Sequence, residues 1–158
     1  MQVMIGPGGW VESVTFSPDG MFIASGSYDR EVRILDAATG LQVGVYTGHS
    51  GHALHVAFSA DGRHVASGGS GGHVHVWSTE APHRSVKDIR DCGWVTSLIW
   101  ISSTRLVIAS SNSVTVCEVD SDNPVEKHYL GEIVAFAVTA DGKLAASSTR
   151  EGLTVWDA

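Results

Sequence analysis

The sequence predicts an all-β fold assembled from four repeated units, each made of short antiparallel strands. Three observations support this prediction. One turn motif returns at a nearly constant interval, apolar side chains between the turns alternate with a period of two, and no segment has a convincing helical period. The 158 residues are enough for one domain with its own core, so we expect residues 1–158 to form a single domain.

The repeat is clearest at the turn that ends the first apolar run of a unit. "FSPDG" (16–20) returns as "FSADG" (58–62) and again as "VTADG" (138–142). An Ala-Ser pair closes the next run in every unit, at residues 24–25, 66–67, 109–110 and 146–147. Spacings of about 40 residues leave no linker between units. The expected units are about 10–46, 52–90, 94–130 and 132–157, with residues 1–5 joined to the last.

The first unit shows how each strand is specified. In "VESVTF" (11–16) the alternation brings Val14 and Phe16 to one face. "SPDG" then favours a turn, because Pro fixes φ, Asp can bond nearby backbone and Gly tolerates a positive φ. The next expected strands are "MFIASGS" (21–27), "EVRILD" (31–36) and "LQVGVY" (41–46).

The fourth unit offers only three strands, at 133–138, 143–148 and 152–157. The start of the chain supplies a candidate for the fourth, because "MQV" (1–3) matches "LQV" (41–43) in the first unit. We therefore expect residues 2–5 to pair with residues 152–157. This pairing would close the array and cover its open edge.

A four-stranded unit that repeats every 40 residues or so is typical of a β-propeller blade. The chain resembles the WD40-repeat family along its whole length. The resemblance rests on Gly48-His49, on the S-x-D-G turns, and on Trp77-Ser78 and Trp156-Asp157 at blade ends. It implies a β-propeller of four blades, each of four antiparallel strands, with the N-terminal strand completing the last blade. It also implies a scaffold that mediates protein–protein interaction.

In that family a blade is often braced by a network of His, Ser or Thr, Asp and Trp. Carried over by position, the network falls on Ser25, Asp29, His49, Ser67, Trp77 and Trp156. No blade holds the full set, since Gly71 replaces the Asp of the second blade and Leu35 the Trp of the first. We expect lower blade rigidity, with apolar packing contributing most of the stability.

The candidate partner-binding residues lie where blades begin and before their third strands. The resemblance places these positions at the mouth of the ring, where partners often dock. Trp, Tyr and Arg are enriched in interface hot spots. The candidates are Trp10, Tyr28, Arg30, His52, Trp94, Glu132 and Arg150. For Trp10 and Trp94 the alternative is that they fill the gap between blades.

The sequence contains no motif of an enzyme active site. H-E-x-x-H, the P-loop and C-x-x-C are all missing, so we expect no catalytic residues and no cofactor. The glycine-rich "SGGSGGH" (67–73) lies between two strands, where no helix N-terminus could bind phosphate. Cys92 and Cys117 are expected to be buried free thiols.

Six of the eight histidines lie in the second unit: His49, His52, His55, His64, His73 and His75. His73 and His75 are two residues apart on one strand, hence on one face. They are candidate metal ligands, but the main expectation is that no metal is bound. They align with Glu31 and Arg33 of the first unit, which favours ordinary solvated or structural roles. A pH-sensitive surface is a further alternative.

The net charge of −7 argues against binding to nucleic acid, and no apolar run is long enough to span a membrane. With no signal-peptide pattern, we expect a cytoplasmic or nuclear location. The expected partner is a protein or peptide, and two copies could pair as a homodimer that closes a larger ring. The alternatives are a C-terminal repeat segment of a larger multi-repeat sensor, such as a nucleotide-binding receptor-like protein, or a His-based metal-binding protein.

Overall fold

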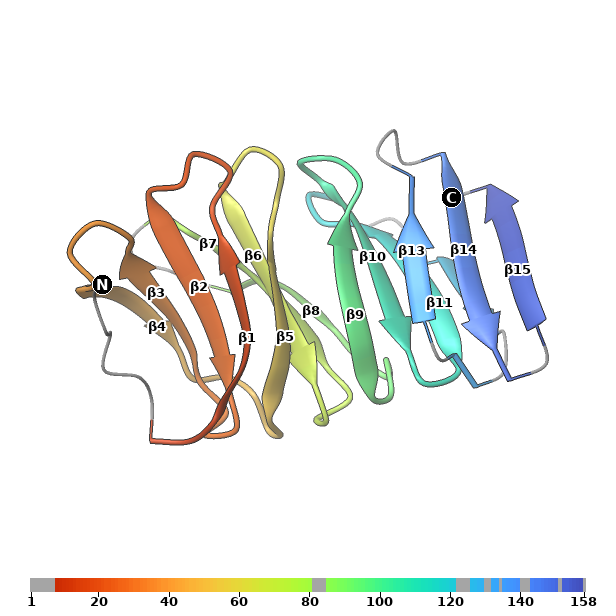
Figure 1. Cartoon of the computed structure of the whole chain (residues 1–158), viewed down its shortest axis with the longest axis horizontal. Helices are drawn as coiled ribbons and strands as arrows, with labels where there is room; N and C mark the ends of the chain where they lie inside the picture. The colour runs from red at the N-terminus through yellow and green to blue at the C-terminus, as the bar shows by residue number, and fades with distance from the viewer. Residues whose placement is uncertain are drawn as a thin grey trace.

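The computed structural model describes residues 8–80, 85–121, 126–129, 132–133, 135–139, 143–150 and 152–157. The strands of this part form four antiparallel sheets. The sheets stand side by side in chain order, as successive layers of a row (Figure 1). The prediction of an all-β fold made of repeated antiparallel sheets is confirmed. Among the described residues, no helix has the length and apolar character needed to cross a membrane.

Strands within each sheet pair in chain order. The first sheet holds β1 (Val11–Phe16), β2 (Phe22–Ser27), β3 (Val32–Asp36) and β4 (Gln42–Tyr46). The second holds β5 (Ala53–Phe58), β6 (His64–Gly69), β7 (Val74–Ser78) and β8 (Ser85–Ile89). The third holds β9 (Val95–Trp100), β10 (Arg105–Ser110), β11 (Ser113–Glu118) and β12 (Glu126–Tyr129). The fourth holds β13 (Ala135–Val138), β14 (Leu144–Thr149) and β15 (Gly152–Asp157).

The repeated turn is held by its own side chains. The Ser17 hydroxyl donates a 2.6 Å hydrogen bond to Asp19 Oδ1, which also accepts the amide of Met21 at 2.9 Å. Gly20 then adopts a φ of 72°, which a residue with a side chain rarely does. In the second sheet, Ser59 bonds Asp61 in the same way, at 2.6 Å. The turn chemistry read from the sequence is thus present in the structure.

The core lies between neighbouring sheets rather than inside any one of them. Ala24, Val32 and Ile34 of the first sheet pack against Val65 and Trp77 of the second. A larger cluster joins the second and third sheets, and a smaller one joins the third sheet to Ile133 and Phe136. Each sheet is therefore stabilised mainly by the sheets on either side, as expected for a repeat array.

No sheet of the described part of the chain covers the outer faces of the first and last sheets. Val14 of β1 is 63% exposed, whereas Val56, its counterpart on β5, is 7% exposed because the first sheet covers it. Phe16 is also exposed, so its alignment with the more buried Phe58 does not make it a core residue. On β15, Leu153 and Val155 are exposed as well. The same residue pattern is thus buried or exposed according to whether a neighbouring sheet is present.

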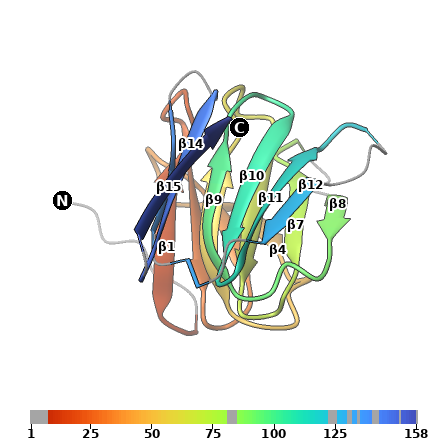
Figure 2. The ribbon, with the colours of Figure 1, turned by 90° about the vertical axis from the view of Figure 1, so that its right-hand side faces the viewer.

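The first and fourth sheets lie at opposite ends of the row (Figure 1). Seen from the end that carries β15, the sheets lie one behind another (Figure 2). Residues 1–5, which were expected to complete the last blade, lie outside the described part of the chain. Closure of four blades into a ring therefore stays a prediction.

Candidate interaction face and histidine cluster

Most candidate residues lie along one edge of the row, at the lower side of Figure 1. This loop-bearing face carries the first residues of β1, β5, β9 and β13 and the turns between the second and third strands of each sheet. The meander of each sheet brings these positions together, because every first strand starts at the edge where its second strand ends. The face is thus a product of the repeat itself.

Three of the candidates form one aromatic patch, which we define as Trp10, Tyr28 and His52. The Trp10 and Tyr28 rings meet edge to face with centroids 5.9 Å apart, and the Tyr28 and His52 rings lie 4.6 Å apart. His52 Nδ1 donates to the Tyr28 carbonyl at 2.7 Å, and the Tyr28 amide donates to the Trp10 carbonyl at 3.0 Å. The patch therefore bridges the first and second sheets.

Both candidate tryptophans face solvent. Trp10 is 79% exposed and Trp94 is 56% exposed, so neither side chain fills a gap between described sheets. Trp94 follows a tight turn in which Asp91 and Gly93 have positive φ. No ring contact joins Trp94 to the aromatic patch within the described part of the chain. Trp94 is thus a second aromatic point on the same face, one sheet further along.

The charged candidates are exposed, and two of them pair with each other. Arg150 Nε lies 3.2 Å from Glu132 Oε2, so the structure brings these two predicted residues together. Because both are exposed, this ion pair contributes little stability. Arg30 has a φ of 73° in the β2–β3 turn, where its amide donates to the Ser27 carbonyl at 3.1 Å. The Arg30 side chain is exposed, and it lies two residues after Tyr28 in the sequence.

The residues assigned to the blade network make different contacts in different sheets. In the second sheet, His49 Nε2 lies 2.8 Å from the Ser67 hydroxyl, and Trp77 is completely buried. In the first sheet, Ser25 is buried, and Asp29 forms a 2.9 Å ion pair with Arg33. The Trp156 side chain lies outside the described part of the structure.

The His49–Ser67 contact lies inside a group of packed rings. Tyr46 of β4 stacks on Trp77 with centroids 5.8 Å apart, and the His49 and His75 rings meet edge to face at 4.7 Å. Burial lowers the pKa of His49 to about 4, with the nearby His75 as the next cause. His49 is therefore neutral at physiological pH and acts as a packed, hydrogen-bonded side chain.

The two candidate metal ligands, His73 just before β7 and His75 on it, do point to the same side, and a third group joins them there. The rings of His73 and His75 are nearly parallel, at 10°, with centroids 5.9 Å apart. Asp88 of β8 lies directly opposite His75 in the strand register. Its Oδ1 is 3.3 Å from His73 Nδ1 and 3.7 Å from His75 Nδ1. We call His73, His75 and Asp88 the histidine cluster.

Asp88 was missed by sequence reasoning because the register of β7 against β8 is not encoded locally. A carboxylate one strand away becomes a neighbour only when the turn between the strands fixes their pairing. The sequence does indicate that Asp88 belongs to the strand that follows the one carrying His75. It does not indicate which residue of the neighbouring strand lies opposite Asp88.

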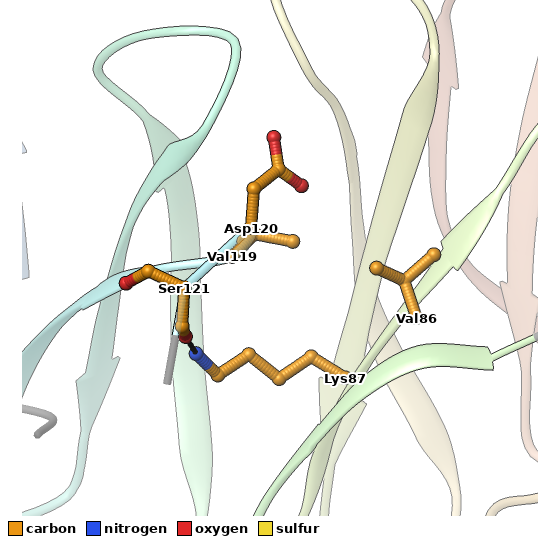
Figure 3. A pocket seen from close by; sticks show the side chains of 5 residues that line it. All are labelled: Val86, Lys87, Val119, Asp120 and Ser121. Atoms are coloured by element: carbon orange, nitrogen blue, oxygen red, sulfur yellow. Dashed lines mark hydrogen bonds between the residues drawn. The ribbon is translucent and has the colours of Figure 1, made fainter. Parts of the chain in front are cut away.

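A cleft of about 300 Å³ lies between β8 and the residues that follow β11, and it too was not expected (Figure 3). Its one lysine, Lys87, reaches across so that Nζ donates to the carbonyls of Ser121, at 2.7 Å, and Glu118. The ammonium group thus links the second and third sheets. Because the Lys87 ammonium group already donates to these two carbonyls, it serves to connect the two sheets rather than to bind an anion in the cleft.

Cys92 and Cys117 are buried free thiols, as expected. Both belong to the core cluster between the second and third sheets. Burial raises the pKa of each thiol to about 11. Neither is a nucleophile near neutral pH, because the thiolate is the reactive form.

Comparison with known proteins matches this geometry to a repeat family. The family described as "WD domain, G-beta repeat" matches residues 1–36 and 40–78. WD repeat-containing protein 1-B of Xenopus laevis is 33% identical over 108 residues, which cover 66% of this chain and 18% of that protein. The guanine nucleotide-binding protein subunit beta of Nicotiana tabacum is 39% identical over 76 residues, covering 45% of this chain and 20% of that protein.

Solved structures agree on the fold. The structure of U3-55K superposes with a TM-score of 0.86 at 23% identity and covers 99% of this chain and 51% of that one. A chain of the mitotic checkpoint complex superposes with a TM-score of 0.80 at 22% identity, over 96% of this chain and 52% of that one. The chain thus spans about half of these solved chains and about a fifth of the two relatives above. The repeated sheets, their turns and these matches together show that the chain belongs to the WD40 repeat family.

Proposed function

We propose that this chain is a non-catalytic scaffold that binds a protein or peptide through its loop-bearing face. The observation that carries the proposal is the aromatic patch. Trp10, Tyr28 and His52 present exposed rings that are held to one another by backbone hydrogen bonds across two sheets. Large, pre-ordered aromatic side chains lose little entropy on binding and dominate interface energies.

The remaining candidates on this face extend the proposed site. Trp94 adds a second aromatic anchor, Arg30 an exposed cation, and Glu132 with Arg150 a polar rim. Interfaces commonly combine buried aromatic anchors with such a rim. With a net charge of −7, the chain favours a partner that is apolar with basic residues rather than a nucleic acid.

The names of similar proteins support a role in assemblies. One is named as a subunit of transcription initiation factor TFIID, one as a G-protein beta subunit, and one solved structure is of the mitotic checkpoint complex. We extend only the general role to this chain. A cytoplasmic or nuclear location fits that role and is part of the proposal.

The test compares exposed apolar residues on and off the proposed face. Peptides selected from a displayed library against the wild-type protein supply the ligand, and fluorescence anisotropy measures its Kd. Trp10→Ala and Trp94→Ala should each weaken binding about 30-fold, which corresponds to a hot-spot loss of roughly 2 kcal/mol. Their melting temperatures should stay near that of wild type, because both side chains are largely exposed.

Leu41→Ala is the matched control, since Leu41 is a similarly exposed apolar residue just before β4, at the edge opposite the loop-bearing face. It should bind like wild type. Unchanged binding by both tryptophan variants would show that the partner does not use this face. Loss of binding in Leu41→Ala alone would place the site at the opposite edge instead.

We also propose that a second copy of the chain covers the two end faces. The exposed face of β1 has the residue pattern that is buried on β5, and the face of β15 takes the place that inner sheets use to cover a neighbour. The two faces are therefore suited to each other. Two copies, each matching about half of a solved propeller chain, would make one ring. Two other arrangements compete with this one. The four blades could close into a ring by themselves, or further blades of a longer chain could complete the ring.

A further inference from the structure

The histidine cluster brings three metal-binding side chains to one point where the β6–β7 turn meets β7 and β8. Their candidate donor atoms, one from each residue, all lie within 4.8 Å of one another. One comes from His73, directly before β7, one from His75 on β7, and the third from Asp88, opposite His75 on β8. His73 and Asp88 are partly open to solvent, and His75 is nearly buried. The cluster is thus accessible from one side and supported from the other.

We propose that His73, His75 and Asp88 form a binding site for a divalent transition metal ion, with Zn²⁺ as the ion that suits it best. Two imidazoles and one carboxylate are ligands that Zn²⁺ commonly takes. Three protein ligands leave a coordination position for water or for a donor from a bound partner. The site is separate from the proposed partner-binding residues and does not depend on them.

The spacing of the donor atoms fits this ion. With metal–ligand bonds of about 2.0–2.1 Å at a tetrahedral angle, neighbouring ligand atoms should lie about 3.3 Å apart. Asp88 Oδ1 lies 3.3 Å from His73 Nδ1 and 3.7 Å from His75 Nδ1. Small rotations of the side chains would therefore complete the geometry without moving the strands.

The surroundings hold the ligands in place. β7 pairs with strands on both sides, so the backbone of His75 is fixed and His73 directly adjoins it. The His75 ring packs against the rings of His49, at 4.7 Å, and Tyr46, at 5.3 Å. His49 is already bonded to Ser67, so it acts as packing and not as a ligand. Such supporting contacts are what make a metal site specific.

A neighbouring arginine orients the carboxylate of the cluster. Arg90 Nε donates to Asp88 Oδ2 at 2.8 Å, which leaves Oδ1 directed at the two histidines. Metal binding would replace the contact between Asp88 Oδ1 and His73 Nδ1, and any proton held there would be released.

The experiment is a Zn²⁺ titration of the full chain, without an affinity tag and after chelator treatment, by isothermal calorimetry at pH 7.5. We expect one Zn²⁺ per chain. His73→Asn and Asp88→Asn should each weaken binding by about tenfold or more, since even supporting residues around a metal change affinity by that factor. Both residues are partly exposed, so these variants should fold, and circular dichroism checks this.

His128→Asn is the control, because His128 is an exposed histidine on β12 outside the cluster. It should bind Zn²⁺ like wild type. Co²⁺ provides a second readout, since its visible absorption reports tetrahedral coordination and should vanish in the double variant His73→Asn with Asp88→Asn. Wild-type affinity in that folded double variant, or no binding by the wild-type protein, would overturn the proposal.

Discussion

His49 links a loop of the chain to the interior of the second sheet. It lies in the β4–β5 connection, yet its ring is buried and hydrogen-bonded to Ser67 of β6. The sequence marks this residue through Gly48-His49, a feature of the family resemblance. What it does not reveal is that His75 and Tyr46 pack around the same ring. Those contacts depend on the packing of one sheet against the next.

The buried state of His49 makes stability depend on pH. Its pKa is about 4 in the folded chain, whereas an unfolded histidine has a pKa near 6.5, so the unfolded chain takes up the proton first. The stabilising contribution is complete above pH 6.5 or so and declines as the pH falls towards 4. Between pH 7.5 and 5 we expect the free energy of unfolding to fall by about 2 kcal/mol from this residue. Urea unfolding across this range measures it.

Comparison with the variant His49→Asn isolates the contribution of His49 to the pH dependence of the free energy of unfolding. The variant should show a shallower decline over the same pH range. His55 and His75 also have lowered pKa values, mainly from burial, and both remain in the variant, so the difference between the two curves reports the removal of His49. His128→Asn serves as the control and should follow the wild-type curve. Parallel curves for wild type and His49→Asn would contradict a buried neutral His49.

At the scale of strands, neighbouring sheets approach most closely at glycines. A Cβ built on Gly26 of β2 would lie 2.7 Å from the Ala53 carbonyl of β5. One built on Gly68 of β6 would lie 3.2 Å from Val95 of β9. These glycines follow the Ala-Ser pair in the first two units, whereas Ser111 and Ser148 follow it in the other two. Only the structure shows which backbone each glycine meets.

Gly26→Ala tests this packing. The added methyl group would press on backbone, which cannot move aside like a flexible side chain, so the sheets must separate. We expect the free energy of unfolding to fall by roughly 1–3 kcal/mol, the usual cost of overpacking. Gly8→Ala is the matched control, since a Cβ there would meet nothing within 4 Å. It should leave stability unchanged, and an equal effect of both variants in urea unfolding would rule out the close approach.

The elements themselves were largely predictable, because their signals are local. The strands of the first unit lie within one residue of their expected bounds, and Asp19 and Gly20 act in the turn as expected. Burial was less predictable. Phe16 and Phe58 occupy equivalent positions but differ in exposure, since a neighbouring sheet covers only one of them. Likewise, the sequence indicated His73 and His75 but could not supply Asp88, whose place depends on strand register.

At the scale of the whole molecule, the two end faces decide how the array is completed. An inner contact buries Val56 and Trp77 of the second sheet against the first sheet. The end faces expose the equivalent apolar side chains, including Val14, Phe16, Leu153 and Val155. Apolar surface of this kind costs about 25 cal/mol per Å² while it stays in water. A second copy would remove both faces from water at once, because the end of one chain meets the start of the other.

We therefore expect light scattering coupled to size exclusion to give twice the 16.7 kDa mass of the chain. Phe16→Glu and Leu153→Glu should each shift the protein towards the monomer, because one charge in either face weakens both equivalent contacts of a two-fold ring. Val86→Glu is the control, since Val86 is an exposed apolar residue on β8 of an inner sheet. A wild-type monomer at high protein concentration would refute the two-copy ring. Dimers that persist in both end-face variants would place the dimer contact elsewhere.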